Sequence, residues 1–364
     1  MLFVVRWDPS EVGGRHTKEP KGRPRLRSTR RTPRDDKLAR IYDDEILPIW
    51  SERFGRMLLR GVADRAPPRA MVLDVGCATG LITLGILPRL DDQSRIIAIE
   101  PSPGLLATAR KKVAAKAGKR VFFRGQDAGR KLPFADDVYD LVLCNLGLAD
   151  NRNPQRALAD FVRVAKPGGR IACTVPLAGT WGELYDIFRE VLIKKDRHEA
   201  MERLDEHLGG YPQPSDIDGW LVGAGLIETA VEVQEFSLLF RSSREFFFAP
   251  LVDFGPLSRW KQVAGQGREV QDVFWDIKQA IDLYFAGRAF RVTVRACCFV
   301  GTKAERTEAD SAADEPMPTT EESLLNTGNR GRTASASGPS IFLESGDLEV
   351  VEGSGGLKRS DGEE

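Results

Sequence analysis

The chain has 364 residues, with 53 basic and 53 acidic side chains, so its formal net charge is zero. The two ends of the chain have opposite net charges. Residues 1–40 carry 12 Lys or Arg against 5 acids, and residues 303–364 carry 6 Lys or Arg against 14 acids. No apolar run approaches the roughly 20 residues that cross a bilayer, which excludes a membrane span. The five cysteines show no CxxC spacing, which argues against a metal site or a disulfide framework. We therefore expect a soluble, cytoplasmic protein that holds no metal.

Both ends differ in composition from the middle of the chain. Residues 1–37 mix Pro, Gly and Arg with almost nothing to bury, and residues 303–364 are rich in Glu, Asp, Ser and Gly. Such segments cannot offset the entropy cost of folding, so we expect a disordered basic leader, a folded domain over residues 38–302 and a disordered acidic tail. The leader is either a basic arm for nucleic acid or a dispensable extension. No aromatic residue interleaves with its arginines between residues 21 and 34, which argues against a stacking platform.

The folded part begins with an amphipathic helical pattern. Apolar residues recur at helical spacing from Leu38 to Leu58, and Pro48 predicts a break or kink between them. Tyr42 and Trp50 lie in this segment. They either close over a ligand or only pack the segment onto the core.

Strand-like apolar runs then alternate with helical patterns. The five runs are residues 71–73, 96–99, 121–123, 139–145 and 171–175. Alternation of this kind is typical of a parallel sheet covered by helices on both faces. We therefore predict an α/β fold with a doubly wound, mostly parallel, Rossmann-like sheet, in which ligands bind at the carboxyl ends of the strands.

Two further strands and two helical inserts follow. Alternating patterns at residues 227–240 and 290–300 predict strands that bring the sheet to seven, and residues 216–223 predict a helix. The inserts span about residues 177–212 and 242–288, and the second is rich in Phe, Trp and Tyr. So many large apolar groups require burial, either in a helical lid or at an oligomer interface.

One short motif carries the chemistry. Asp74, Gly76 and Gly80 form a D-x-G-x-x-x-G pattern directly after the first strand, and a helical pattern follows them. Glycines in a strand-to-helix turn let a ligand approach the bare backbone. Dinucleotide enzymes use G-x-G-x-x-G instead, which brings the backbone against a diphosphate. The missing middle glycine and the acid disfavour a phosphate and favour a cationic, phosphate-free ligand.

Four segments extend this motif in a fixed order. They are Val72-Leu-Asp-Val-Gly-Cys-Ala-Thr-Gly80, Ile99-Glu-Pro-Ser102, Leu132-Pro-Phe-Ala-Asp-Asp-Val-Tyr-Asp-Leu-Val142, and a helix from Leu158 that ends in Lys166-Pro-Gly-Gly169. Together they resemble the class I S-adenosylmethionine-dependent methyltransferases, in particular the small-molecule, type 11-like group. The resemblance covers about residues 70–175 and implies S-adenosylmethionine as the cofactor.

The resemblance implies cofactor contacts around the glycine turn. Gly76 and Gly80, with Cys77 between them, would let the backbone approach the methionine part of the cofactor. Asp74 would offset its ammonium group, directly or through water. Glu100 ends the second strand, where its carboxylate would accept both ribose hydroxyls. The alternatives are glycines that only shape a turn and a surface acid placed there by chance.

The resemblance implies further contacts at the ends of the second to fourth strands. Pro101 would flank the adenine, Asp127 would accept its amino group, and the backbone amide of Ala128 would meet a ring nitrogen. Asn145 would lie beside the sulfonium. Asp127 has an alternative as an ordinary turn aspartate and Asn145 as a strand-end cap.

Fewer sequence features indicate the site of the methyl acceptor. A sulfonium methyl is already activated, so the protein mainly aligns an acceptor and excludes water; a general base is optional, and no catalytic residue is assigned. We expect the acceptor among the helical inserts, with Tyr42, Trp50 and Trp181 as candidate contacts. His198 and His207 are either solvated side chains or bases.

The predicted function is therefore in-line methyl transfer to a small molecule, or to an acyl or quinone-like metabolite. The layout of the inserts is similar to methyltransferases of malonyl-carrier protein and of quinone precursors, an analogy of layout only. Alternatives are a methyltransferase of nucleic acid or protein that uses the basic arm, a non-catalytic binding protein of the same fold, and an NAD-dependent oxidoreductase. The fourth strand ends in Asn145-Leu-Gly-Leu148, without the Pro-Pro-aromatic motif of nucleic-acid amino methyltransferases, and the body is not strongly basic.

Overall fold

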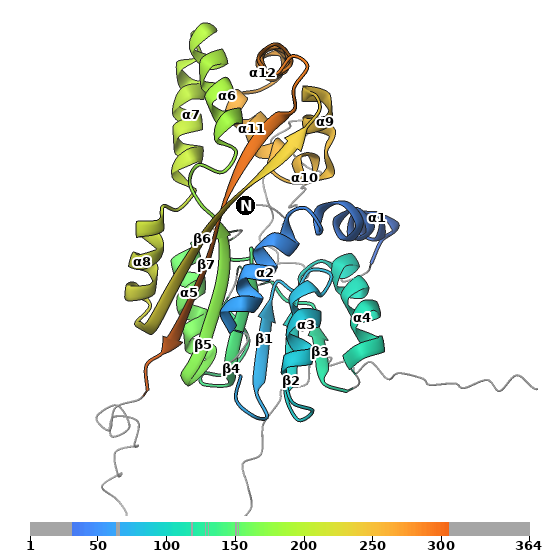
Figure 1. Ribbon diagram of the computed structural model, residues 1–364, viewed down its shortest axis with the longest axis vertical. Helices are drawn as coiled ribbons and strands as arrows, with labels where there is room; N and C mark the ends of the chain where they lie inside the picture. The colour runs from blue at the N-terminus through green and yellow to red at the C-terminus, as the bar shows by residue number, and fades with distance from the viewer. Residues whose placement is uncertain are drawn as a thin grey trace, which may run out of the picture. The chain divides into compact units, whose positions relative to one another are not determined.

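The computed structural model describes residues 31–62, 66–117, 119–127, 129, 131–149, 151 and 153–305 (Figure 1). The predicted acidic tail, apart from residues 303–305, and residues 1–30 of the predicted leader lie outside the described residues. Residues 31–304 fall within one compact unit. In the part of the chain that the structure describes, no helix is both long and apolar enough to cross a membrane.

The segment before the sheet is a broken helix. Helix α1 (Pro33–Ile41) begins ahead of the predicted boundary at Leu38, so the predicted leader extends too far. The physical reason is a capping box at Thr32, whose hydroxyl accepts from the Asp35 amide while the Asp35 carboxylate accepts from the Thr32 amide. A π-helical turn, η2 (Tyr42–Ile46), and a bend over residues 47–50 lead into α2 (Ser51–Val62). The predicted break at Pro48 is confirmed.

The sheet has seven strands in the order β3-β2-β1-β4-β5-β7-β6. They are β1 (Met71–Val75), β2 (Arg95–Ile99), β3 (Val121–Arg124), β4 (Tyr139–Asn145), β5 (Ala165–Pro176), β6 (Leu226–Phe240) and β7 (Phe290–Lys303). Strands β1 to β5 pair in parallel, and β7 runs antiparallel between β5 and β6. The predicted doubly wound, mostly parallel sheet is confirmed. Its order reverses between β1 and β4, where such sheets hold their ligands.

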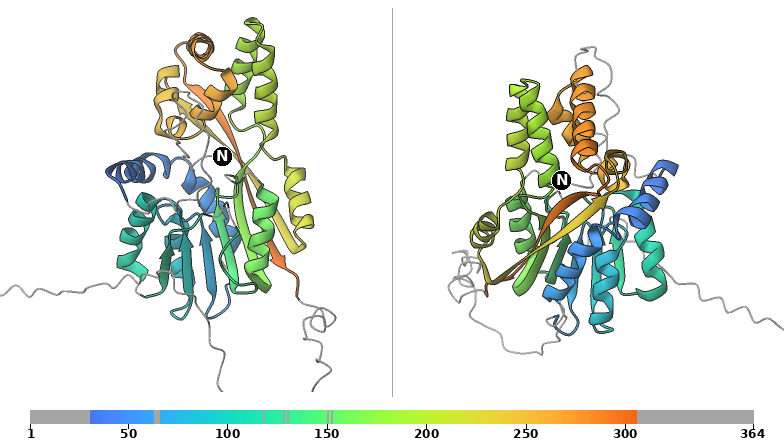
Figure 2. Two further views of the ribbon diagram at one scale, coloured as in Figure 1. Left: turned by 180° about the vertical axis from the view of Figure 1, so that it is seen from behind. Right: turned by 45° about the horizontal axis from the view of Figure 1, so that its top comes forward.

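Helices cover both faces of the sheet (Figures 1 and 2). On one face lie α2, α3 (Leu81–Ile86), the short η3 (Leu87–Arg89) and α4 (Pro103–Ala117); on the other lie α5 (Pro154–Val164) and α8 (Pro214–Gly223). Strand β1 shows how its sequence serves both layers, because Val72 belongs to one buried cluster and Leu73 and Val75 to the other. This alternation follows from the two-residue period of a strand.

A helical lid lies beyond the carboxyl ends of the parallel strands (Figure 1). It is built from α6 (Gly182–Lys194), α7 (His198–Gly209), α9 (Ser243–Phe248), α10 (Pro250–Asp253), α11 (Leu257–Ala264) and α12 (Arg268–Tyr284). Both predicted inserts are thus helical. Phe246 and Trp260 of the aromatic insert are fully buried inside the lid, whereas Phe248, Trp275 and Tyr284 stay exposed. Burial within the lid therefore accounts for much of the aromatic content.

Candidate active site

The glycine turn follows β1 and is held against the end of β2. Gly76 and Gly80 adopt φ angles of +71° and +87°, a region that side chains with a Cβ rarely occupy. The backbone amides of Gly76 and Cys77 both donate to the carbonyl of Ile99, at 2.9 and 3.0 Å. Helix α3 begins directly after Gly80. The predicted strand-turn-helix is therefore present, and its backbone is fixed by β2.

Asp74 is the buried acid at the end of β1. One carboxylate oxygen accepts a hydrogen bond from the Thr83 hydroxyl at 2.5 Å, and the other, Oδ1, is buried without a hydrogen-bond partner among the described residues. Burial raises the pKa of Asp74 to about 6, partly offset by its hydrogen bonds with Thr83. A buried, unsatisfied carboxylate oxygen is costly unless a donor reaches it. The ammonium group of S-adenosylmethionine is such a donor, so the residues present fit this cofactor.

Glu100 joins the end of β2 to the glycine turn. Its side chain is buried, and its two carboxylate oxygens accept from the amides of Ala78, at 3.1 Å, and Ser102, at 2.8 Å. A carboxylate at this place could also accept from ribose hydroxyls, and that contact stays a prediction. Pro101, which follows it, is exposed at the mouth of this site. Glu100 thus also shapes the turn that it is predicted to serve.

Asp127 lies after β3 and is half-buried. Its Oδ1 atom accepts from the Gly129 amide at 2.8 Å, which is the local turn bond typical of aspartate. Ala128, predicted as its partner at the adenine, lies outside the described residues. The adenine contact of Asp127 stays a prediction.

Asn145 ends β4 with both ends of its amide engaged. It donates to the Ser51 carbonyl at 3.0 Å and accepts from the Thr174 hydroxyl at 2.7 Å. The side chain therefore ties α2 to β5, and the predicted contact beside the sulfonium stays a prediction. A methyl group placed on Gly76 would lie 3.9 Å from the Cα atom of Gly147, so the turn after β4 packs against the glycine turn.

Cys77 is buried within the glycine turn. Burial raises the pKa of its thiol well above the ordinary value, and the carboxylates of Asp74 and Glu100 add to the effect. The thiol is therefore neutral at physiological pH and unsuited to nucleophilic attack. The predicted contact of Cys77 with the cofactor stays a prediction.

The structure adds one residue that sequence reasoning missed, Asp43. Asp43, in the π-helical turn before the sheet, accepts from the Thr79 hydroxyl of the glycine turn at 2.6 Å. The same carboxylate oxygen accepts from the Lys112 ammonium on α4, also at 2.6 Å. Asp43 thereby clamps the segment before the sheet onto the cofactor turn. Asp43 is the first of three consecutive acids on a helical segment, so no sequence signal distinguishes it.

The three predicted acceptor contacts lie in the core between α2 and α6. Tyr42 is buried, with its hydroxyl 2.9 Å from the Ser51 hydroxyl. Trp50 and Trp181 are fully buried and stack on each other, with ring centroids 5.6 Å apart and planes 12° apart. Their indole N–H groups have no hydrogen-bond partner among the described residues. Their burial is that of packing residues, and their contact with an acceptor stays a prediction.

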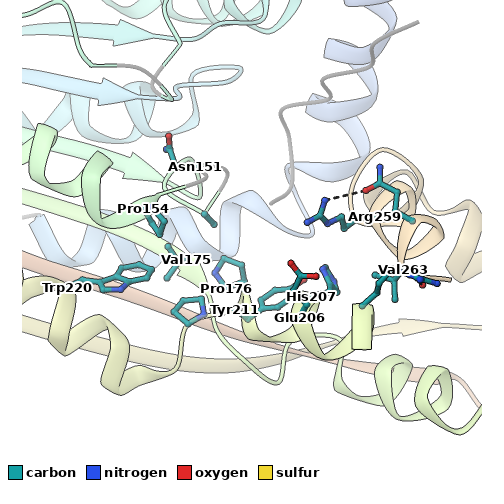
Figure 3. Close-up of a pocket in the computed structure, with 15 residues that line it drawn as sticks. Asn151, Pro154, Val175, Pro176, Glu206, His207, Tyr211, Trp220, Arg259 and Val263 are labelled. Carbon is teal, nitrogen blue, oxygen red and sulfur yellow. Dashed lines mark hydrogen bonds between the residues drawn. The ribbon is translucent and has the colours of Figure 1, made fainter. Parts of the chain in front are cut away.

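A cavity of about 420 Å³ opens elsewhere, at the carboxyl ends of β4 and β5 beneath α7 and α11 (Figure 3). Its volume lies within the usual range of small-molecule sites. None of the predicted cofactor or acceptor residues that the structure describes lines it. The lining combines Ala149 and Asn151 after β4, Val175 and Pro176 of β5, Pro154 and Trp220 of the covering helices, and Arg203, Glu206, His207, Gly210, Tyr211, Pro212, Arg259, Gln262 and Val263 of the lid.

A hydrogen-bonded chain stiffens the wall of this cavity. The Trp260 indole N–H donates to the Tyr185 hydroxyl at 2.9 Å, and that hydroxyl lies 2.9 Å from Nε2 of His207. Burial, and then the nearby Arg259, lower the pKa of His207 to about 4. His207 is thus a buried, neutral imidazole; His198, by contrast, is exposed.

Comparison with known proteins agrees with this geometry. The family model of the methyltransferase domain matches residues 72–169, the stretch from β1 to the start of β5. A demethylmenaquinone methyltransferase of Clavibacter sepedonicus is 30% identical over 202 residues, covering 52% of this chain and 79% of that protein. Another from Mycobacterium bovis is 30% identical over 210 residues, covering 53% and 84%. The solved structure of YcgJ from Bacillus subtilis matches with a TM-score of 0.45 and 17% identity, covering 70% of this chain and 100% of that one.

The resemblance suggested by the four sequence segments is therefore confirmed. The strand order, the glycine turn and the relatives, of which this chain covers 79% and 84%, agree with one another. The chain belongs to the class I S-adenosylmethionine-dependent methyltransferases, and S-adenosylmethionine is its cofactor.

Proposed function

We propose that this enzyme methylates a small, quinone-like or acyl metabolite that binds in the cavity below the lid. One observation carries the proposal: the segment that follows β4 borders both the cofactor turn and the cavity. Gly147 packs against Gly76 of the turn, and Ala149 and Asn151, a few residues on, line the cavity. A methyl donor at the turn and an acceptor in the cavity would therefore be separated by only this short segment.

The cofactor would be held by the residues at the carboxyl edge of the sheet. Asp74 would receive its ammonium group, since the buried Oδ1 atom awaits a donor. Gly76 and Gly80 would admit the methionine part, and Glu100 would accept the ribose hydroxyls. Asp127 would accept the amino group of the adenine.

The chemical demands on the protein are modest. When bound, the cofactor supplies an activated methyl group, and the chain must align the acceptor and exclude water. The lid helices cover the cavity and provide that exclusion. His207 is the lid residue whose side chain could serve as a general base. With a pKa of about 4, it would act mainly as a neutral hydrogen-bonding group at physiological pH.

The names of the relatives favour an aromatic acceptor of the quinone type. Those relatives are demethylmenaquinone methyltransferases, and this chain covers 79% of one and 84% of another. A cavity lined by Trp220, Val175 and two prolines at one end suits a flat apolar ring. We also propose a cytoplasmic enzyme, since all five cysteines are free and buried.

The exposed side chains Phe248, Trp275 and Tyr284 give the lid an apolar surface that could join two copies. Sedimentation at several protein concentrations would test this, with Trp275→Ala expected to shift any dimer toward the monomer.

The acceptor can be identified by labelling. Purified enzyme, a small-molecule cell extract and S-adenosylmethionine with a deuterated methyl group should yield a product heavier by one labelled methyl, which mass spectrometry would identify. Demethylmenaquinol is the first pure compound to try. A Gly76→Arg enzyme serves as the control, because it should transfer no label. Label found only in protein or nucleic acid would contradict the proposal.

A further inference from the structure

The cavity has two chemically different ends (Figure 3). Trp220, Val175 and Pro154 form an apolar end beside the sheet. His207 and Arg259 lie toward the other end, under α7 and α11. A ligand that fills it would therefore be amphipathic, with a ring at one end and a polar group at the other.

The polar end carries more positive than negative charge. Arg203 and Arg259 line it, against one acid, Glu206. Within the described residues, the guanidinium of Arg259 has a hydrogen bond only to the Gln262 side chain, at 3.3 Å, and no carboxylate as an ion-pair partner. Arg203 lies 3.8 Å from Glu199, an exposed residue that water screens. Arg259 in particular is free to receive an anion.

The neutral His207 lines this end, and its neighbours decide which ring nitrogen carries the proton. An indole N–H can only donate, so the Tyr185 oxygen accepts from Trp260. The Tyr185 hydroxyl then donates along its shorter contact, 2.9 Å to His207 Nε2, rather than along the 3.4 Å contact to the Tyr211 hydroxyl. The proton of His207 consequently sits on Nδ1. A neutral donor beside two guanidinium groups favours a ligand rich in acceptors.

The helices that carry these groups are tied together. Tyr185 of α6 joins Trp260 of α11 to His207 of α7, and the Arg203 Nε donates to the Val263 carbonyl of α11 at 3.0 Å. Such cross-links lower the cost of ordering the donors when a ligand binds. The buried His207 and the half-buried Arg203 are thus held in place, and Arg259 adds an exposed guanidinium from the first turn of α11.

We propose that the methyl acceptor is an aromatic carboxylate, with its ring against Trp220 and its carboxylate on Arg259. This rests on the proposed function, which it narrows from quinone-like metabolites in general to those that carry an anionic group. The match is one of charge and shape: a carboxylate satisfies a guanidinium in a fork geometry, and a flat ring fills the apolar end.

Paired probes test the anionic group. The full chain, saturated with S-adenosylhomocysteine, is titrated by calorimetry with 1-hydroxy-2-naphthoate and with 1-naphthol, which differ only in the carboxylate. A charge-assisted hydrogen bond predicts that the naphthoate binds about tenfold tighter or more. Arg259→Gln should abolish that difference and leave 1-naphthol unaffected. Arg268→Gln, an exposed arginine outside the cavity, should leave both affinities unchanged.

A second variant locates the ring. Trp220→Ala should weaken both probes, whereas Arg259→Gln weakens only the naphthoate. Equal affinity for the two probes, or an Arg259→Gln enzyme that still prefers the naphthoate, would overturn the carboxylate assignment. The proposed function fails separately: it would still stand if the labelled extract yielded a neutral quinol product. It would fall, and this inference with it, if no small molecule were labelled.

Discussion

The Asp74 carboxylate accepts a 2.5 Å hydrogen bond from the hydroxyl of Thr83, nine residues further along the chain. This bond spans the glycine turn and links the end of β1 to α3. It satisfies one carboxylate oxygen and leaves the other buried and without a partner in the described structure. The turn is therefore ready for a cationic donor, and its stability and affinity both depend on pH.

Asp74→Asn should change the pH dependence of the apo enzyme. The pKa of Asp74 is raised from 3.8 to about 6, so the native state takes up a proton that the unfolded chain does not until lower pH. The wild-type apo enzyme should therefore gain about 2 kcal/mol of stability from this group between pH 7.5 and pH 4.5. Asn cannot titrate, so the variant should lose that gain. Urea unfolding at the two pH values measures it, and an identical pH dependence in both proteins would contradict the assignment.

The same group should make cofactor binding pH-dependent. The ionised carboxylate attracts the cofactor's ammonium group, so affinity for S-adenosylmethionine should rise as the pH rises through about 6. In Asp74→Asn the affinity should be lower at pH 7.5 and nearly flat across this range. Calorimetric titrations from pH 5 to pH 8 would show it.

Gly76→Arg should abolish cofactor binding. The residue needs a φ of +71°, and a side chain there would project from the backbone that the cofactor approaches. Gly219→Arg is the matched control, because a side chain on that exposed glycine of α8 meets nothing within 4 Å. Titration with S-adenosylhomocysteine should show binding in the control alone. Wild-type affinity in Gly76→Arg would remove the turn from the cofactor site.

Thr79→Val should loosen the clamp between the cofactor turn and the segment before the sheet. The variant loses the 2.6 Å bond to Asp43, a loss of about 1 kcal/mol, or roughly fivefold in cofactor affinity if the clamp orders the turn. Thr229→Val, at an exposed position of β6, should bind as the wild type does. Unfolding curves measured alongside would separate a loss of affinity from a loss of fold.

Trp50→Ala should be strongly destabilising. Trp50 is fully buried and stacked on Trp181, so truncation leaves a large cavity and costs about 3–5 kcal/mol. Val222→Ala, at a residue that is 78% exposed, should stay within about 0.5 kcal/mol of the wild type. Urea denaturation followed by circular dichroism compares them. A mild effect of Trp50→Ala would show that the residue lines open space, as an acceptor contact would.

His207→Gln should reduce sensitivity to acid. The pKa of His207 is lowered from 6.5 to about 4, so the unfolded chain binds a proton before the native state does. Stability is therefore lost as the pH falls below 6.5, by about 2–3 kcal/mol at pH 4.5. The variant should lose less between pH 7.5 and pH 4.5. His198→Gln is the control, because that side chain is 87% exposed, and it should follow the wild type.

Much of the structure of residues 70–175 could be predicted, because their sequence patterns extend over only a few neighbouring residues. The strands from Met71 onward appear as uninterrupted apolar runs, and Gly76 and Gly80 stand at a spacing that a strand-to-helix turn requires. Glu100 was predicted from its place at the end of β2, and its bonds to Ala78 and Ser102 agree with a site there. Helix α1 begins before the predicted boundary at Leu38, because the capping box at Thr32 is made by polar residues that carry no hydrophobic pattern.

The lid and the cavity below it depend on contacts between residues that are far apart in the sequence. Tyr185, His207 and Trp260 meet through hydrogen bonds, yet the first and last are 75 residues apart in the chain. Their meeting depends on how α6, α7 and α11 pack, which periodicity does not encode. The same holds for Trp50 and Trp181, predicted to contact an acceptor and found stacked in the core.

The sequence by itself determined the fold class and the glycine turn, because these depend on local periodicity and on spacings of a few residues. Its resemblance to the methyltransferases implied the cofactor. Only the tertiary structure showed where a cavity for an acceptor lies and which charged side chains line it. Helices that follow one another in sequence can pack in several ways, and the packing of side chains from separate elements selects among them. That packing creates the cavity at the ends of β4 and β5 and leaves Arg259 there without a carboxylate among the described residues.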